Sequence, residues 1–182
     1  MKARILVWLV ALFCCHNVLF AQKEFVNASA RLSGHPRILL QKGEEKALKK
    51  VIMKDAVWKD IHQSLVDEAG EIVKLPLNER IKTGRRLLSV SRENLRRIFI
   101  LSYAYRMTGK NEFLKRAESE MLKAASFSDW NPSHFLDVGE MTMALAIGYD
   151  WLYPQLSVQT KKEIENAIVE KGLKPSFDER YN

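Results

Sequence analysis

The sequence predicts an all-α protein built from antiparallel helical hairpins. Apolar residues recur at intervals of three and four along most of the chain after residue 43, which is the period of an amphipathic helix. Short stops containing Gly or Pro separate these segments, and no stretch shows the alternation of a half-buried strand. Helices joined by such short turns are expected to be antiparallel neighbours.

The first helical region opens at Gly43 and is followed by a second segment from about Asp55 to Glu71, before the helix-breaking Pro76. This second segment has one apolar face, made of Trp58, Ile61, Leu65 and Ala69. Residues 77–89 are expected to form an irregular connection, because Thr83-Gly84 interrupts the helical pattern.

A third helix is expected to begin at Ser91, a favourable N-cap, and to end at Met107 before the stop Thr108-Gly109-Lys110. The next helix follows at once, and its inward face holds Phe113, Ala117, Met121 and Ala124 or Ala125. The last helix is expected to begin after the cap Ser157, with Ile164, Ala167 and Ile168 directed inward and Gly172 and Pro175 at its end.

The helix expected from Phe135 to Leu152 is apolar on every side, so other helices should enclose it before Pro154 stops it. Small or polar residues fall on one stripe of this helix, namely Asp137, Glu140, Ala144, Gly148 and Trp151. Two interpretations fit this stripe. It lines a cavity, or it belongs to a core helix whose two acids bond to neighbouring backbone or arginines, with Arg96 or Arg97 as the expected partner.

The first 21 residues are expected to be a signal peptide, with Lys2 and Arg4 before the apolar run Ile5–Phe13 and cleavage near Ala21. Residues 22–42 then form an extended lead-in that contains a turn at 34–37 and a short apolar anchor at 38–40. Export to the periplasm or the extracellular space follows from this interpretation. The apolar run is too short for a stable membrane span after cleavage.

Both cysteines, Cys14 and Cys15, lie within the predicted signal peptide, which excludes disulfides, thiol catalysis and cysteine-based metal sites from the mature chain. The net charge of +7 falls to +5 when Lys2 and Arg4 are removed. Outside the cell, a mildly basic surface fits acidic glycans or anionic lipids better than nucleic acid. The alternative is an ordinary solvated surface, since Lys and Glu alternate along the helix faces.

Five residues are candidate substrate contacts, because they combine aromatic, amide, imidazole and carboxylate groups before and within the apolar helix: Trp130, Asn131, His134, Asp137 and Glu140. Each also has a structural interpretation, since a Trp in a helical array usually packs in the core and His134 could cap the helix. The basic pairs Arg85-Arg86 and Arg96-Arg97 could meet acidic sugar or pair with nearby acids. No catalytic residue, metal ligand set or cofactor is expected.

Three motifs give the chain a resemblance to a known family: GHPRILL at 34–40, YAYRMTGKNEFLKRAE at 103–118, and HFLDVGEMTMALAIGYDWLYPQLS at 134–157. Together they resemble the N-terminal helical domain of heparinase II/III-like polysaccharide lyases. The resemblance implies an incomplete toroid of α/α hairpins over residues 43–182. In the family a β-sandwich follows the toroid, and both the sandwich and the rest of the toroid are absent from this sequence.

The resemblance also implies a reaction. Such lyases cleave uronic-acid-containing glycans by β-elimination, which needs a group that offsets the uronate carboxylate, a base and an acid, usually Tyr and His. The motif that carries these groups in the family has no counterpart here, so this chain alone is expected to be inactive. The rival hypothesis is a non-enzymatic exported helical module that binds glycan or protein.

Overall fold

A computed structural model of the protein describes residues 34–181. The predicted signal peptide, both cysteines and residues 22–33 of the predicted lead-in lie outside the described residues. Residues 35–181 belong to one compact unit.

The all-α prediction is confirmed for the described part of the chain. The helices there are α2 (Glu45–Lys54), α3 (Ala56–Lys74), α4 (Leu88–Thr108), α5 (Asn111–Ala125), α6 (Phe135–Leu152) and α7 (Val158–Ala167). A π-helical turn η1 (Ile168–Leu173) and a 3₁₀ turn η2 (Lys174–Phe177) continue directly from α7. The β-pairing between residues 34 and 181 is limited to an isolated bridge between Thr83 and Arg86.

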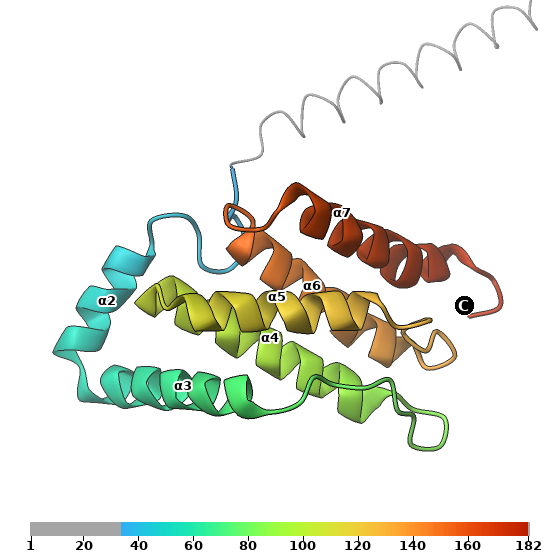
Figure 1. Cartoon of the computed structure of the whole chain (residues 1–182), viewed down its shortest axis with the longest axis horizontal. Coiled ribbons are helices and arrows are strands. Elements are labelled where there is room, and N and C mark those ends of the chain that lie inside the picture. Colours follow the sequence, from blue (N-terminus) through green and yellow to red (C-terminus); the bar gives the residue numbers. More distant parts are fainter. Residues whose placement is uncertain (1–33, 182) are drawn as a thin grey trace, which may run out of the picture. The chain divides into compact units, whose positions relative to one another are not determined.

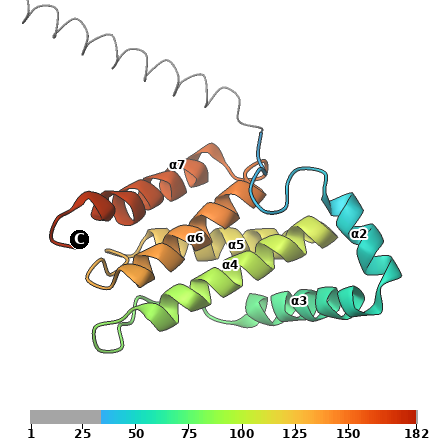
Figure 2. The same ribbon diagram turned by 180° about the vertical axis from the view of Figure 1, so that it is seen from behind.

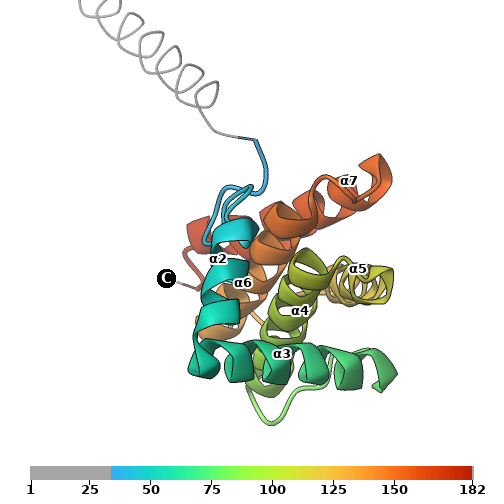
Figure 3. The same cartoon turned by 90° about the vertical axis from the view of Figure 1, so that its left-hand side faces the viewer.

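Helices α3 to α7 form two sets that run in opposite directions, and α2 lies across their direction at one end (Figure 1). Helices α4 and α6 lie side by side, and they make the most extensive pairing in the unit. Helices α3, α5 and α7 run the other way and pack around this pair, as the end-on view in Figure 3 and the reverse view in Figure 2 show. The chain therefore alternates in direction from α3 to α7.

Local chemistry explains several helix ends. The Asp55 carboxylate accepts hydrogen bonds from the N–H groups of Val57 and Trp58, which caps α3. The Ser157 hydroxyl accepts from Thr160 N–H, which confirms the predicted cap of α7. Gly109 adopts a left-handed conformation at φ 74°, where a glycine avoids the steric cost of a side chain, and it ends α4 as predicted.

Two predicted helix boundaries are wrong. Helix α4 begins at Leu88, so Ser91 is not the N-cap of this helix. The buried Ser91 hydroxyl instead lies within hydrogen-bonding distance of Leu88 O and Glu140 Oε2. Gly172 does not end the last helix either, because η1 and η2 carry the chain on to Phe177. Gly172 instead lets η1 approach α6, since an added Cβ would lie 2.5 Å from Thr142 Oγ1.

Helix α6 packs tightly, and its small-residue stripe does not line a cavity. Ala144 is fully buried, and a Cβ added to Gly148 would lie 2.5 Å from Met121 Sδ and 2.6 Å from Ile98 Cγ2. The stripe is thus the surface on which α4 and α5 approach α6. The expectation that α6 is enclosed on all sides is also wrong, because Leu136, Gly139 and Met143 are exposed along a face about 100° around the helix from the stripe.

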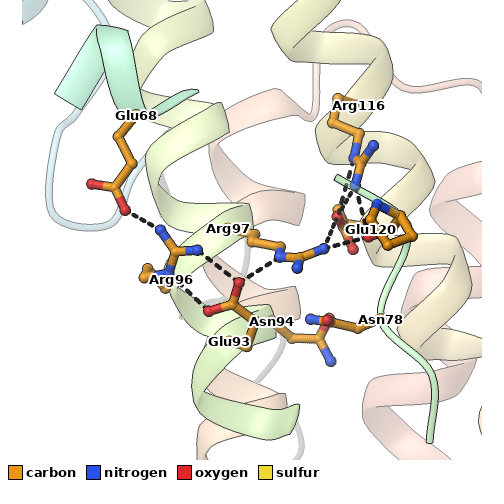
Figure 4. A network of polar contacts seen from close by, with 9 residues as sticks. Glu68, Asn78, Glu93, Asn94, Arg96, Arg97, Arg116 and Glu120 are labelled. Carbon is orange, nitrogen blue, oxygen red and sulfur yellow. Dashed lines mark hydrogen bonds and ion pairs between the residues drawn. The ribbon is translucent and has the colours of Figure 1, made fainter. Parts of the chain in front are cut away.

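A buried charge network joins α3, α4 and α5 (Figure 4). Arg97 donates to Glu93, to Glu120 and to the Pro76 carbonyl at 2.7, 3.1 and 2.7 Å. Arg116 donates to Glu120 at 2.7 Å and to the Val73 carbonyl at 3.0 Å. Since Glu120 is fully buried, losing either arginine would leave its charge poorly compensated.

The close packing at Gly148 gives a direct stability test. Gly148→Ala is expected to lower the free energy of unfolding by about 1–3 kcal/mol, because the stiff, buried Ile98 side chain has little room to move. Gly139→Ala is the matched control on the same helix, since nothing lies within 4 Å of the added Cβ; it should raise stability by up to about 1 kcal/mol. Denaturant unfolding of both variants measures the difference, and an unaffected Gly148→Ala protein would contradict this packing.

Candidate functional site

The Asp137 carboxylate is the centre of a buried polar cluster at the start of α6. It is fully buried, and its Oδ2 accepts from Leu87 N–H at 2.7 Å and from the Asn131 amide at 2.6 Å. Its Oδ1 lies 3.0 Å from His134 Nδ1, so the imidazole donates from that nitrogen. Asn131 also donates to the Arg85 carbonyl at 2.8 Å. The cluster therefore joins the turn before α4 to the turn before α6.

The segment held by this cluster is a basic turn, residues 82–86, closed by the bridge between Thr83 and Arg86. The side chains of Lys82, Arg85 and Arg86 are exposed, and none makes an ion pair within the described residues. Only the backbone of Arg85 and Leu87 is fixed by Asn131 and Asp137. The side chains of the turn are thus presented to solvent from a fixed backbone.

Glu140 has a different partner from the one predicted. Its two oxygens bind the Ser91 hydroxyl at 2.8 Å and Arg92 Nε at 3.0 Å. Arg96 and Arg97 pair with Glu68, Glu93 and Glu120 in the network of Figure 4, so the predicted pairing with Asp137 or Glu140 is wrong. The sequence alone does not show which arginine of α4 pairs with an acid of α6, because the rotation of α4 about its axis decides which one faces α6.

The structure brings the five candidate substrate contacts together but encloses three of them. Trp130, Asn131 and Asp137 are buried, and the Trp130 indole donates to the Ala124 carbonyl at 3.0 Å. These contacts favour the structural interpretation of the three residues. His134 and Glu140 keep side-chain exposures of 28% and 16%, so they retain surface that a ligand could reach.

The environment of Asp137 favours its ionised form. Burial opposes ionisation, but the hydrogen bonds from Asn131, Leu87 N–H and His134 outweigh it, and the pKa of the Asp137 carboxyl lies below its ordinary value of 3.8. The cluster therefore contains a carboxylate at neutral pH. An ionised group that is fully hydrogen-bonded by the protein is suited to holding backbone in place.

A second buried aspartate lies at the other end of α6. Asp150 Oδ1 lies 2.6 Å from His35 Nδ1, and Oδ2 accepts from the N–H groups of Arg37 and Ile38 at 2.9 and 3.0 Å. The Trp151 indole donates to the Ile38 carbonyl at 2.9 Å. The motifs at 34–40 and 134–157 are thus in direct contact.

This contact corrects the predicted apolar anchor at 38–40. Ile38 and Leu39 are exposed, and Leu39 has a positive φ of 56°. Residues 38–40 are held through their peptide groups. Asp150 was not singled out from the sequence, because an acid flanked by aromatic residues does not indicate its partner.

A surface cleft of about 390 Å³ lies beside this contact, lined in part by His35, Lys42, Tyr105, Arg106, Trp151 and Gln155. The Arg106 guanidinium is occupied by Glu45 and by the carbonyls of Leu40 and Gln41. The His35 ring stacks on Tyr153 with centroids 4.1 Å apart, and its Nδ1 is bonded to Asp150. Arg106 and His35 in this cleft therefore hold the lead-in.

Residues 34–181 contain no cluster of three or more His, Cys, Asp or Glu side chains that could hold a metal ion. Over the same residues no helix combines the length and apolarity needed to cross a membrane. In comparisons with known proteins, the chain matches no family, and no curated protein shows significant similarity to it.

The structural role of Asp137 is testable by substitution and pH. Asp137→Asn is expected to lower the free energy of unfolding by about 1.5–3 kcal/mol at neutral pH, since hydrogen bonds to a charged group are lost. Because the folded pKa lies below the unfolded one, this stabilisation is present above pH 3.8 and is lost as pH falls through the folded value. Denaturant unfolding from pH 7 to pH 3 should show the two proteins converging.

Asp60→Asn is the matched control, because Asp60 is an exposed carboxylate on α3. It should leave stability nearly unchanged throughout this pH range. A loss in Asp137→Asn no larger than in this control would remove the proposed positioning role of the cluster.

Proposed function

We propose that this chain is the N-terminal helical part of an exported polysaccharide lyase that acts on uronic-acid-containing glycans by β-elimination. The proposal rests on the residue resemblance to heparinase II/III-like lyases, together with a basic surface that a buried carboxylate holds in place. No residue of the chain is assigned a catalytic role. The part proposed for it is to contact the acidic chain of the substrate.

The helix arrangement supports the toroid part of this proposal. In a toroid of α/α hairpins, successive inner helices run parallel to one another and the outer helices run in the opposite direction. The pair α4 and α6 fits the inner positions, and α3, α5 and α7 fit the outer ones (Figures 1 and 3). The exposed stripe of Leu136, Gly139 and Met143 on α6 is where a neighbouring hairpin would pack in a complete toroid.

The proposed substrate contact rests on one observation: Asp137 forms hydrogen bonds both to the turn before α4 and to His134 before α6. One carboxylate binds Leu87 N–H, next to Arg86, and His134 Nδ1. The charge of the exposed Arg92 is offset by its ion pair with Glu140 at 3.0 Å. The cations left without an ion pair within the described residues are Lys82, Arg85 and Arg86 on the turn at 82–86, which we name the Arg85–Arg86 surface.

This surface suits an acidic polysaccharide for an electrostatic reason. Uronate and sulfate groups repeat along such chains, and several fixed cations can meet several of them at once. In β-elimination the carboxylate of the reacting uronate must also be offset, so a lyase needs cations along its groove. Arginines whose backbone is already fixed lose less conformational freedom when they bind.

The rival function is a non-enzymatic exported module that binds glycan or protein. The same Arg85–Arg86 surface favours it equally, because binding needs no acid or base. The two functions differ in one measurable property. A protein that contains these helices and any following domain should show eliminative activity if the lyase proposal is right. Glycan binding without such activity would favour the module.

Binding to an acidic polysaccharide should depend on the basic turn. Arg85→Ala/Arg86→Ala is expected to weaken binding to alginate or heparan sulfate about five- to tenfold, and the remaining affinity should fall less steeply with salt. Affinity electrophoresis or calorimetry over a salt series measures both quantities. The charge-matched control is Lys115→Ala/Lys162→Ala, two exposed lysines on α5 and α7.

Equal weakening by the two double variants would show that binding follows net charge alone, which contradicts a defined surface. Both arginines are exposed and do not contribute side chains to the core, so the variant should fold normally. Circular dichroism of each protein checks this point.

The chain by itself should have no eliminative activity, since the Tyr and His groups of the family lie outside the motifs it matches. Purified chain is incubated with heparan sulfate, chondroitin sulfate and alginate, and the ultraviolet absorbance of unsaturated uronate is followed. We expect the absorbance to stay constant with time. Absorbance that grows in proportion to protein concentration would place a catalytic group within these residues.

A further inference from the structure

The corner where α2 meets α3 carries apolar and basic side chains on one exposed surface, which we name the α2–α3 corner. Its apolar members are Met53, Val57, Trp58 and Ile61, with Met53 75% and Val57 67% exposed. Its basic members are Lys46, Lys49, Lys50 and Lys54, all of them exposed. Every residue from 53 to 61 is exposed, so this is a continuous stretch of uncovered chain.

The packing of α3 explains why this surface is uncovered. The apolar stripe of α3 runs from Trp58 through Leu65 to Ile72, and its later part is buried against α4 and α5. Its first two turns extend past these helices toward the junction with α2 (Figures 1 and 3). Trp58 and Ile61 are therefore about half exposed although they lie on the stripe that is buried further along the helix.

The lysines of α2 lie together on one face of that helix. At 100° per residue, Lys46, Lys49, Lys50 and Lys54 surround Met53 on the face opposite Leu48 and Ile52. None of the four makes an ion pair or side-chain hydrogen bond within residues 34–181. Among the nearby acids, Glu45 pairs with Arg106. Glu44, Asp55 and Asp60 are exposed carboxylates without an ion pair within residues 34–181, and with Lys59 the exposed lysines outnumber them five to three.

We propose that the α2–α3 corner docks on an anionic lipid surface. Large aliphatic and aromatic side chains placed beside unpaired lysines are the composition of helices that lie in a membrane interface. The lysines would meet phosphate groups of anionic lipids, while Met53, Val57 and Trp58 would enter the boundary between headgroups and acyl chains. This docking is peripheral and does not require a membrane-spanning helix.

Charge and apolarity together favour lipid over the other occupants. An acidic polysaccharide would satisfy the lysines, but it offers hydroxyl and acid groups and no apolar phase for Met53, Val57 and Ile61. A second copy would bring the same four lysines face to face, and like charges at close range oppose that contact. A lipid surface offers anionic headgroups to the lysines and an apolar phase to the apolar side chains.

The experiment compares the full chain with two corner variants in sedimentation with vesicles. The vesicles contain either phosphatidylcholine alone or a mixture of phosphatidylcholine and phosphatidylglycerol. One variant removes charge, Lys46→Gln/Lys49→Gln/Lys50→Gln/Lys54→Gln, and one removes apolar groups, Met53→Ser/Val57→Ser. The matched charge control is Lys115→Gln/Lys162→Gln. Residues 1–33 are identical in all four proteins, so any binding that they contribute cancels in the comparison.

The expected result is at least about tenfold weaker partition of both corner variants onto vesicles that contain phosphatidylglycerol, with the control unchanged. Equal partition of all four proteins overturns the proposal. Loss of binding in the charge variant alone, with competition by soluble heparin against the native chain, overturns it in favour of a polyanion surface. Self-association that disappears in Met53→Ser/Val57→Ser and prevents vesicle binding overturns it in favour of a second copy.

A second measurement does not depend on the stability of the multiple variants. Lipid brominated near the headgroup end of its acyl chains should quench the fluorescence of Trp58 in the native chain. Because the chain has a fourth tryptophan, Trp8, both proteins in this comparison also carry Trp8→Phe. In that background Trp58→Phe should remove most of the quenching, because Trp130 and Trp151 are buried. Quenching that is unchanged in Trp58→Phe would show that the corner does not enter the lipid.

Discussion

Buried and half-buried charged side chains that bind peptide groups hold the non-helical segments in the described part of this protein. Asp150 accepts from two N–H groups of the lead-in, and Asp137 accepts from the one that precedes α4. Arg97 and Arg116 donate to carbonyl groups at the end of α3 and just after it. Lys171 does the same for the carbonyls of Ala125 and Phe127, at the end of α5. The helices pack mainly through an apolar core, with ion pairs between α3, α4 and α5, and charged groups also hold the connections in place.

This division has a physical reason. Connections expose peptide groups that helices satisfy internally, and a buried peptide group without a partner costs free energy comparable to a lost hydrogen bond. A carboxylate can accept several N–H groups at once, and a guanidinium can donate to several carbonyls. One buried charge thus satisfies a whole turn. Because ionised groups form stronger hydrogen bonds than neutral ones, they also define the position of that turn more closely.

The sequence predicts the helices well because their determinants are local. Apolar spacing, the cap at Ser157 and the glycine stop at Gly109 each act within one or two turns of chain. Ser91 misled the prediction, since a serine that caps a helix and one that bonds to a glutamate on another helix look alike in sequence. Gly172 misled it in the same way, because close approach to Trp130 and Thr142, rather than termination, explains the glycine.

The candidate site was predictable only in part for a related reason. The cluster of Asn131, His134 and Asp137 is local, so the chain segment that contains it stood out. Its partners Arg85 and Leu87 are more than forty residues away and contribute backbone, which carries no side-chain signature. The same holds for Asp150 and the lead-in, where the separation exceeds one hundred residues.

The basic turn at residues 82–86 is held through its backbone, so its exposed side chains can be substituted without loss of these hydrogen bonds. Asn131 and Asp137 hold only a carbonyl and an N–H group there, so neither stability nor turn position requires arginine at 85 or 86. Mutation could therefore explore new charge patterns on this turn at little cost to folding. Such an arrangement lets the exposed side chains at positions 82, 85 and 86 vary independently of the fold, whereas Gly84 has to be kept because its φ of 61° is strained for other residues.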